Sequence, residues 1–281
     1  MEYKTLSNGV KMPILGFGVY QVPDLAECER VVSDAISVGY RSIDTAQAYM
    51  NEEAVGNAIR KSGIAREEFF ITTKIWISNY GYEKAKASLD ASLEKLQTDY
   101  IDLVLLHQPF GDYYGAYRAM EEYYKAGKIK AIGISNFAPD RVADLAIFSD
   151  VAPMVNQVET HVFNQQVNAR KTMDEYGVQI ESWGPFAEGS NHLFTNETLV
   201  AIGSKYHKTA AQVALRYLIQ RDVIVIPKTV HKNRMEQNFD VFDFVLTDDD
   251  MAEILKLDTG KSLFFSHTDP ETVKALSSFK I

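Results

Sequence analysis

The sequence contains a single cysteine, Cys28, among 281 residues. One thiol can form no disulfide within the chain and cannot build a cysteine-ligated metal cluster. Cys28 lies in "DLAECERVVSDAISVG", whose apolar periodicity is typical of a helix. We therefore expect a structural role for Cys28, no disulfide framework and no metal site.

Long apolar runs and an excess of positive charge are also missing. No stretch approaches the roughly 18 apolar residues of a membrane span. The start, "MEYKTLSNGVKMP", has neither a basic leader nor an apolar core, so we expect no signal peptide and a cytoplasmic location. A formal net charge of −9 disfavours nucleic acid and anionic membranes as partners. We expect a monomer that meets any anionic ligand through a local basic cluster.

Short apolar runs alternate with amphipathic stretches from residue 15 almost to the end, which is typical of βαβ units and a parallel sheet. In front of them, "TLSNGVKMP" predicts a small β-hairpin, because Asn8 and Gly9 suit a tight turn. Further on, Asn51 followed by Glu52 and Glu53 predicts a helix N-terminus. Eight strands are predicted, at residues 15–20, 41–44, 69–74, 101–107, 129–135, 154–159, 178–183 and 223–228.

The length alone allows one domain or two. Because no linker, low-complexity tract or shift in composition divides the chain, we expect one domain over residues 1–281, a single (β/α)8 TIM barrel with the small N-terminal hairpin. A doubly wound sheet is the alternative. Its dinucleotide-binding form should carry G-x-G-x-x-G after the first strand, and "GFGVYQ" lacks the third glycine.

Active sites of such barrels lie at the C-terminal ends of the strands. Taken singly, Asp44 could be a turn residue, Lys74 a surface lysine and His107 a core histidine. Taken together, a carboxylate, an ammonium and an imidazole end three consecutive strands, with Tyr49 in the loop above. Other polar or aromatic strand ends are Ser135, Asn136, Gln157, Glu159, Trp183 and Lys228.

These side chains suit proton donation to an oxygen that gains negative charge. A tyrosine has an ordinary pKa of about 10, and a nearby cation such as Lys74 should lower it. Asp44 can keep that lysine charged, and His107 can orient a bound carbonyl toward Tyr49. The matching hydride must come from a cofactor, for which a nicotinamide is the natural source.

Several later residues suit such a cofactor. Ser135, Asn136 and Gln157 offer groups for a carboxamide, and Trp183 offers a flat face for stacking. The loop at 184–194 has glycines that allow backbone amides to approach a pyrophosphate. In "IPKTVHKNRMEQN", at 226–238, basic residues follow the eighth strand, where barrels often bind phosphate. An additional phosphate group favours NADPH over NADH.

The sequence resembles the aldo-keto reductase superfamily over its whole length, close to bacterial 2,5-diketo-D-gluconate reductase and prostaglandin F synthase-like members. The motifs that carry this resemblance are "GYRSIDTAQAYMNEEAVG", "ITTK", "LVLLHQP", "IGISNF", "VNQVE" and "IPKTVHKNRMEQN". The resemblance implies reduction of aldehydes or ketones with NADPH, catalysed by Asp44, Tyr49, Lys74 and His107. The cofactor residues that it implies, together with those expected from the loop, are Ser135, Asn136, Gln157, Trp183, Gly184, Pro185, Phe186, Gly189, Lys228, Thr229, Val230, Arg234, Gln237 and Asn238.

The substrate pocket is where the sequence departs from the family pattern. Gln108 follows the histidine where many relatives have Trp, and Trp183 replaces a common Tyr. The loop after the histidine and the C-terminal tail are short, so we expect an open pocket. The residues expected to line it are Tyr20, Tyr49, Trp76, His107, Gln108 and Phe110. The substrate is expected to be a small carbonyl compound. A cofactor-sensing barrel with negligible turnover and a Schiff-base aldolase that uses Lys74 are the alternative functions.

Overall fold

A computed structural model describes residues 2–281. It begins with the predicted hairpin, in which β1 (Tyr3–Thr5) pairs antiparallel with β2 (Lys11–Pro13). The connection is longer than a two-residue Asn-Gly turn, because the backbone N–H of Leu6 bonds to the carbonyl of Val10. Only Gly9 of the turn pair has a positive φ, of 88°. The hairpin prediction is confirmed, and its turn is wider than expected.

Eight parallel strands form one sheet that closes on itself, as predicted for a (β/α)8 barrel. The two edge strands meet where the N–H of Gly16 donates to the carbonyl of Val225 at 2.8 Å. The strands are β3 (Phe17–Gly18), β4 (Ser42–Asp44), β5 (Phe70–Ile75), β6 (Ile101–Leu106), β7 (Ile129–Ser135), β8 (Val155–Glu159), β9 (Gln179–Trp183) and β10 (Ile224–Val225). Each lies within or overlaps its predicted range. The first and last, which meet at the seam, are the shortest, with two residues each.

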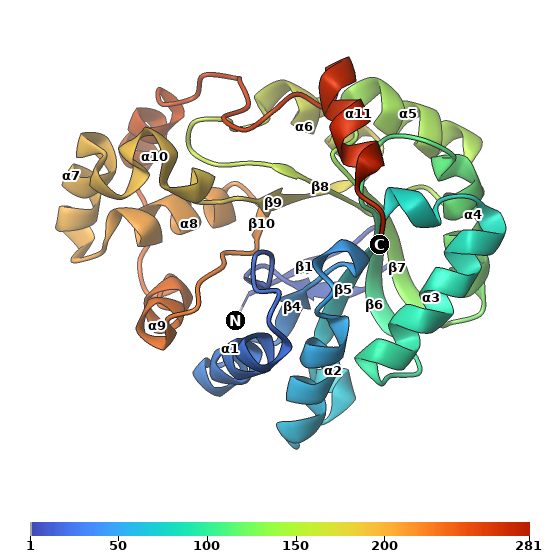
Figure 1. The fold of residues 1–281 in the computed structure, drawn as a ribbon. Helices are drawn as coiled ribbons and strands as arrows, with labels where there is room; N and C mark the ends of the chain where they lie inside the picture. Colours follow the sequence, from blue (N-terminus) through green and yellow to red (C-terminus); the bar gives the residue numbers. More distant parts are fainter. Residues whose placement is uncertain (1) are drawn as a thin grey trace.

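Helices surround the sheet as an outer ring (Figure 1). The α-helices are α1 (Leu25–Val38), α2 (Glu52–Lys61), α3 (Tyr82–Leu96), α4 (Tyr113–Lys125), α5 (Pro139–Phe148), α6 (Val167–Glu175), α7 (Glu197–Tyr206), α8 (Ala210–Gln220), α9 (Lys232–Phe239), α10 (Asp248–Leu255) and α11 (Pro270–Ser278). Short 3-10 turns are η1 (Gln47–Tyr49), η2 (Arg66–Glu68), η3 (Ile77–Asn79) and η4 (Ala187–Thr195). Two helices, α7 and α8, separate β9 from β10, where a plain βα repeat would place one.

Helix α1 illustrates how the sequence defines these elements. The Asp24 carboxylate accepts a hydrogen bond from the N–H of Glu27 and caps the helix. Cys28, Val31 and Ala35 then recur at three- and four-residue spacing and are fully buried against the sheet. Burial raises the pKa of the Cys28 thiol to about 12, so the thiol stays protonated and unreactive. This environment fits the expected structural role.

Helix α2 begins at Glu52, as its sequence predicts, but for a different reason. The Asn51 side chain makes no capping bond to the helix. Instead it accepts from Thr45 Oγ1 at 2.7 Å and donates to the carbonyls of Val19 and Val22, both at 3.1 Å. Asn51 therefore ties the loops after β3 and β4 together beside the barrel mouth.

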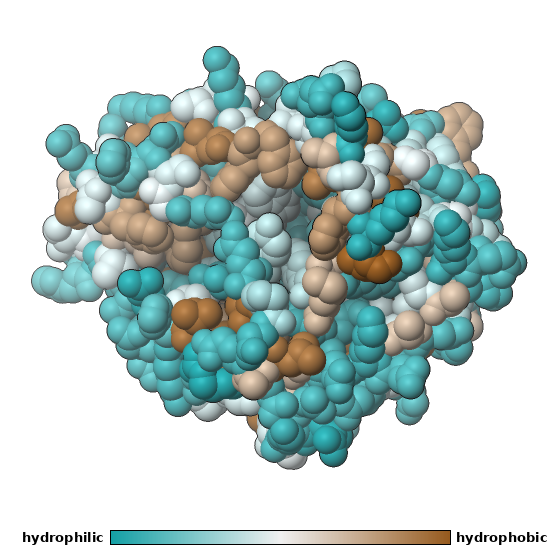
Figure 2. Space-filling view, viewed as in Figure 1, coloured by the Kyte–Doolittle hydropathy of each residue, from teal (hydrophilic) through white to brown (hydrophobic). Residues whose placement is uncertain are grey.

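None of the helices among residues 2–281 is long and apolar enough to cross a membrane. The face that carries the C-terminal ends of the strands is hollowed near its middle (Figure 2). This hollow is where the predicted site residues should gather.

Candidate active site

Three predicted catalytic side chains come from neighbouring strands. Asp44 ends β4, Lys74 lies near the end of β5, and His107 directly follows β6. The N–H of His107 donates to the carbonyl of Ile75 at 3.1 Å, which keeps the ends of β5 and β6 level. Tyr49 belongs to the turn η1 between β4 and α2. The barrel thus brings all four predicted residues to one end.

The Lys74 ammonium is the centre of this group. Its Nζ lies 2.6 Å from Asp44 Oδ1, 2.9 Å from the Thr45 carbonyl oxygen and 3.4 Å from Tyr49 Oη. The lysine side chain is fully buried. Burial lowers the pKa of Lys74, but Asp44 and then Tyr49 act in the opposite direction, and the net effect raises it. Lys74 is therefore charged at neutral pH.

The pKa of the Tyr49 hydroxyl differs from the predicted one. Burial raises the pKa of Tyr49 to about 12, although the Lys74 ammonium acts in the opposite direction. The expected lowering by Lys74 is present but is smaller than the cost of placing a phenolate in a dry site. The expectation of a net decrease was wrong, and Tyr49 is protonated at neutral pH.

His107 is a neutral imidazole. Burial and then the Lys74 charge hold the pKa of His107 well below its ordinary value. Its ring lies edge-on to Tyr49, with centroids 5.7 Å apart, and edge-on to Trp76 at 5.0 Å. Its Nδ1 has no hydrogen-bond partner among residues 2–281. A neutral imidazole can still donate one hydrogen bond to a bound oxygen.

The residues predicted for a carboxamide form a connected network. Ser135 Oγ donates to the Gln157 carbonyl at 2.8 Å, and Asn136 Nδ2 donates to the His107 carbonyl at 3.1 Å. Asn136 Oδ1 accepts from Trp183 Nε1 at 2.7 Å, which fixes the indole. Asn136 has a φ of 66°, a left-handed conformation that Asn tolerates better than most residues. These contacts link three strand ends to the catalytic group.

The predicted pyrophosphate loop follows β9 and is rich in left-handed conformations. Gly184 has a φ of 62° and Gly189 a φ of 80°. Pro185 is buried, and Phe186 is half-buried against Phe194. Positive φ values at closely spaced residues turn successive backbone N–H groups inward, which is how loops bind anions.

The predicted phosphate residues lie around the start of α9. Lys228 and Val230 are half-buried, and Arg234 is exposed. Among residues 2–281 no carboxylate forms an ion pair with Lys228, Lys232 or Arg234. The helix has no side-chain N-cap. The Arg234 N–H donates to the His231 carbonyl at 3.0 Å, so among residues 2–281 the N–H groups of Lys232 and Asn233 are the ones left without a partner in this turn.

The other three residues predicted near α9 differ in their exposure to solvent. Thr229 is buried, and its Oγ1 accepts from the His231 N–H at 3.2 Å. Gln237 is exposed, whereas Asn238 is buried. Of the two residues predicted for an adenine, Gln237 is thus the accessible one.

The predicted substrate residues occupy different depths. Tyr20 is 53% exposed, and its ring packs on Tyr49 with centroids 5.0 Å apart. Trp76 and Gln108 are buried. Phe110 stacks on His267 at 6.2 Å. Tyr20, Trp76 and Phe110 come from the loops that follow β3, β5 and β6, at the same end of the barrel, and their place in a substrate pocket stays a prediction, as does that of Gln108.

The C-terminal tail covers the site more than the sequence suggested. Trp76 Nε1 donates to the Phe279 carbonyl at 2.7 Å, and the two rings pack at 5.6 Å. Phe264 packs on Trp183 at 5.2 Å. The expected open pocket is corrected, because the tail contacts both tryptophans. The run "LFFSH" was the available signal, since such exposed aromatic clusters need a partner surface.

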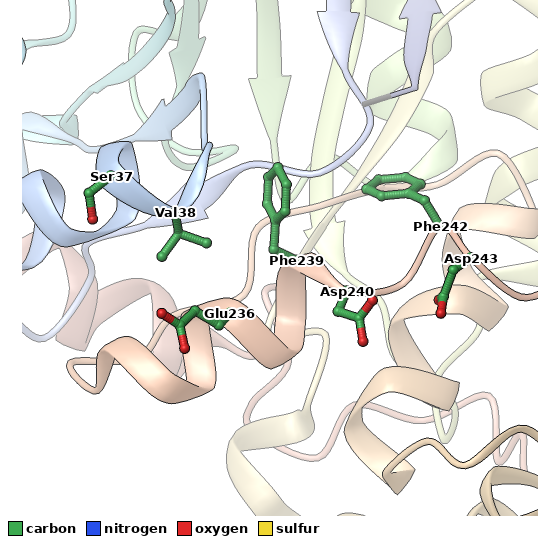
Figure 3. A pocket seen from close by; sticks show the side chains of 7 residues that line it. All are labelled: Ser37, Val38, Glu236, Phe239, Asp240, Phe242 and Asp243. Atoms are coloured by element: carbon green, nitrogen blue, oxygen red, sulfur yellow. The ribbon is translucent and has the colours of Figure 1, made fainter.

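A surface groove of about 630 Å³ lies away from this site, between α1 and α9 (Figure 3). It is lined by Ser37, Val38, Glu236, Phe239, Asp240, Phe242 and Asp243. Val38 ends the helix that leads into the start of β4, so the groove lies toward the opposite end of the barrel. Its acidic rim suits neither a phosphate nor the chemistry above.

Residues 15–259 match the Aldo/keto reductase family. A glyoxal reductase of Bacillus subtilis is 46% identical over 250 residues, covering 89% of this chain and 90% of that protein. The chain belongs to the aldo/keto reductase family of oxidoreductases.

Solved structures agree on the fold. An aldo-keto reductase from a Medee basin deep-sea metagenome, MGS-M4, superposes with a TM-score of 0.91 at 42% identity, covering 95% of this chain and 98% of that one. A Bombyx mori aldo-keto reductase, AKR2E4, in complex with NADP superposes with a TM-score of 0.88 at 32% identity, covering 97% and 96%.

Proposed function

We propose that the protein is an NADPH-dependent reductase that converts aldehydes or ketones to alcohols, with Tyr49 as the proton donor. The carrying observation is the Lys74 ammonium, held 2.6 Å from Asp44 Oδ1 and 3.4 Å from Tyr49 Oη in a buried site. Burial keeps the phenol protonated, and Lys74 supplies a cation beside the phenolate that forms when the proton leaves.

NADPH suits the residues around the mouth of the barrel. The half-buried Trp183 indole is fixed by Asn136 and offers a face for a flat ring. The left-handed loop after β9 would hold a pyrophosphate, and the basic side chains at the start of α9 would hold a further phosphate. When bound, the nicotinamide supplies the hydride. The NADP complex of the 32% identical Bombyx mori reductase supports this choice of cofactor.

The roles of the chain's own residues follow from their charges. Neutral His107 donates a hydrogen bond to the substrate oxygen and orients it toward Tyr49. As that oxygen gains negative charge, Tyr49 Oη transfers its proton to it. The Lys74 ammonium stabilises the resulting phenolate, and Asp44 keeps Lys74 charged. Burial of the group excludes water and strengthens each of these interactions.

A Schiff-base aldolase that uses Lys74 is disfavoured by the same geometry. A nucleophilic amine must be deprotonated, and the pKa of Lys74 is raised by Asp44 and Tyr49 in spite of burial. The three N–H donors of its Nζ are also committed, to Asp44, to the Thr45 carbonyl and to Tyr49 Oη.

The function is tested by NADPH oxidation with simple aldehydes, sugar ketones and α-dicarbonyls, alongside a fluorescence titration of NADPH binding. We expect saturable oxidation with at least one carbonyl class. Tight NADPH binding without oxidation across the whole set would instead support a cofactor-sensing barrel, and absence of both would refute the proposal.

A further inference from the structure

A second carboxyl group lies inside the barrel, beneath the catalytic group. Glu181 belongs to β9 and is completely buried. It is the register partner of Gln157 on β8. Side chains alternate along a strand, so Glu181 points to the same side of the sheet as Trp183, two residues later. It therefore lies one layer deeper in the barrel than the indole.

Gln157 connects Glu181 to the catalytic group. Its Nε2 donates to Asp44 Oδ2 at 2.8 Å and to Glu181 Oε2 at 2.9 Å. A side-chain amide has two N–H groups and one carbonyl oxygen. Both N–H groups are used, one on each carboxyl, so the carbonyl oxygen is the remaining polar atom of the amide. The Asp44 carboxylate also excludes the flipped amide, because a flip would place the amide oxygen 2.8 Å from a group that can only accept.

We propose that Glu181 is a positioning residue that, together with Asp44, locks the Gln157 amide so that its carbonyl oxygen faces the ligand. A carbonyl oxygen can accept only from a donor, and a primary amide such as the nicotinamide carboxamide provides one. This inference rests on the proposed function, because it takes the ligand of Gln157 to be that carboxamide. Asp44 thereby has two tasks, since its other oxygen binds Lys74.

Glu181 performs this task as a neutral acid. One ammonium, Lys74, faces two carboxyl groups in a dry interior, and it binds Asp44. Glu181 has no ion pair among residues 2–281, and its Oε1 has no hydrogen-bond partner there. An isolated buried carboxylate is very costly. Burial, and then the charge of Asp44, raise the pKa of Glu181 to about 8.

The other titratable groups at this end of the barrel do not change the neutral state of Glu181. Tyr49 and His107 are both neutral at neutral pH for the reasons given above. Lys74 favours the charged form of Glu181 but acts more weakly than burial. A proton on Oε1 leaves Oε2 free to accept from Gln157, as the 2.9 Å contact requires.

Two substitutions distinguish the loss of the hydrogen-bond acceptor at residue 181 from a change in side-chain volume. Glu181→Gln keeps a neutral oxygen of the same reach, whereas Glu181→Met keeps a similar volume without an acceptor. The matched control is Thr72→Val on β5, which alters another buried polar side chain whose oxygen has no hydrogen-bond partner among residues 2–281. Thermal unfolding establishes that each variant is folded.

The first readout is the NADPH dissociation constant from a fluorescence titration. Loss of one buried hydrogen bond should weaken binding roughly tenfold in Glu181→Met. Glu181→Gln and Thr72→Val should stay within about twofold of the native protein. Unchanged affinity in Glu181→Met would overturn the positioning role. Equal weakening in Glu181→Gln would overturn the role of a neutral acceptor.

The second readout needs no cofactor. Infrared difference spectra of the free protein at neutral pH, native minus Glu181→Gln, should contain the carbonyl band of a protonated carboxylic acid. A carboxylate band in its place would overturn the inference. If the native protein bound no NADPH, the proposed function would fail, and the spectrum would still decide the state of Glu181.

Discussion

Lys74 is the residue on which the other site residues depend. It makes hydrogen bonds to Asp44, to the Thr45 carbonyl and to Tyr49, and it is completely buried. A buried charge whose partner is removed destabilises a protein far more than the pair stabilises it. The pair that we propose prepares Tyr49 for proton donation is therefore also required for the stability of the barrel.

Replacement of Lys74 should reveal both roles. Lys74→Met leaves the Asp44 carboxylate buried without its cation, so we expect a loss of about 3–5 kcal/mol in the free energy of unfolding. Adding Asp44→Asn should recover much of that stability without restoring turnover. Urea denaturation and steady-state NADPH oxidation measure the two effects. A double variant as unstable as the single one would contradict the assignment of the pair.

Glu181 should leave a signature in the pH dependence of stability. Its pKa is about 8 in the folded protein and near the ordinary 4.5 when unfolded. The folded state therefore binds the extra proton, and stability falls as the pH rises between these values, by up to about 1.4 kcal/mol per pH unit. Relative to the native protein, Glu181→Gln should gain stability from pH 5 to 8 and level off above 8. A constant difference in unfolding free energy across this range would contradict a protonated Glu181.

At the scale of elements, the proposed cofactor site depends on the start of α9 and on the C-terminal tail. Helix α9 has no side-chain N-cap, and no carboxylate among residues 2–281 forms an ion pair with its Lys232 or Arg234. The tail residues Phe264 and Phe279 pack on Trp183 and Trp76. Each element contributes through contacts made far away in sequence.

The α9 cluster should discriminate between the two nicotinamide cofactors. Arg234→Ala removes one exposed cation, so we expect the Michaelis constant for NADPH to rise roughly tenfold while that for NADH stays constant. Lys256→Ala is the matched control, because Lys256 is also exposed but lies at the end of α10. An unchanged Michaelis constant for NADPH in Arg234→Ala would refute the phosphate assignment.

The tail contact can be followed with the two tryptophans of the chain, which both belong to the site. Phe279→Ala removes the ring that packs on Trp76, so water should reach that indole more readily. We expect more efficient quenching of tryptophan fluorescence by acrylamide. Phe148→Ala, which alters an exposed ring on α5, serves as the control and should have no effect. Equal quenching in Phe279→Ala and the native protein would mean that the tail does not cover the mouth in solution.

At the scale of the whole molecule, barrel closure explains which features the sequence could predict. Asp44, Lys74 and His107 end consecutive strands, so parallel pairing alone brings them together, and their arrangement was predictable. Glu181 was not predicted as a site residue, although Glu181 and Trp183 alternate along one predicted strand. The prediction used only the residues at the strand ends, and Glu181 lies one layer deeper in the barrel. Asn51 was predicted as a cap, yet its side chain joins two loops that only closure brings near.

The direction in which the pKa of Tyr49 shifts was not predictable for a similar reason. The sequence identifies Lys74 as a neighbouring cation but does not state how much water the closed barrel excludes. The tail contacts with Trp76 and Trp183 also depend on where the far end of the chain returns. Local patterns therefore predicted the strands and their ends, whereas burial and long-range contacts required the structure.

The most direct test of the central claim is a single-turnover measurement of NADPH oxidation by Tyr49→Phe with a simple aldehyde. Phenylalanine keeps the ring but removes the proton that Lys74 and Asp44 position, so hydride transfer should slow by about 100-fold or more. The dissociation constant of NADPH should stay within about twofold of the native value, because Tyr49 is assigned to the substrate oxygen. Hydride transfer at the native rate in Tyr49→Phe would contradict the account.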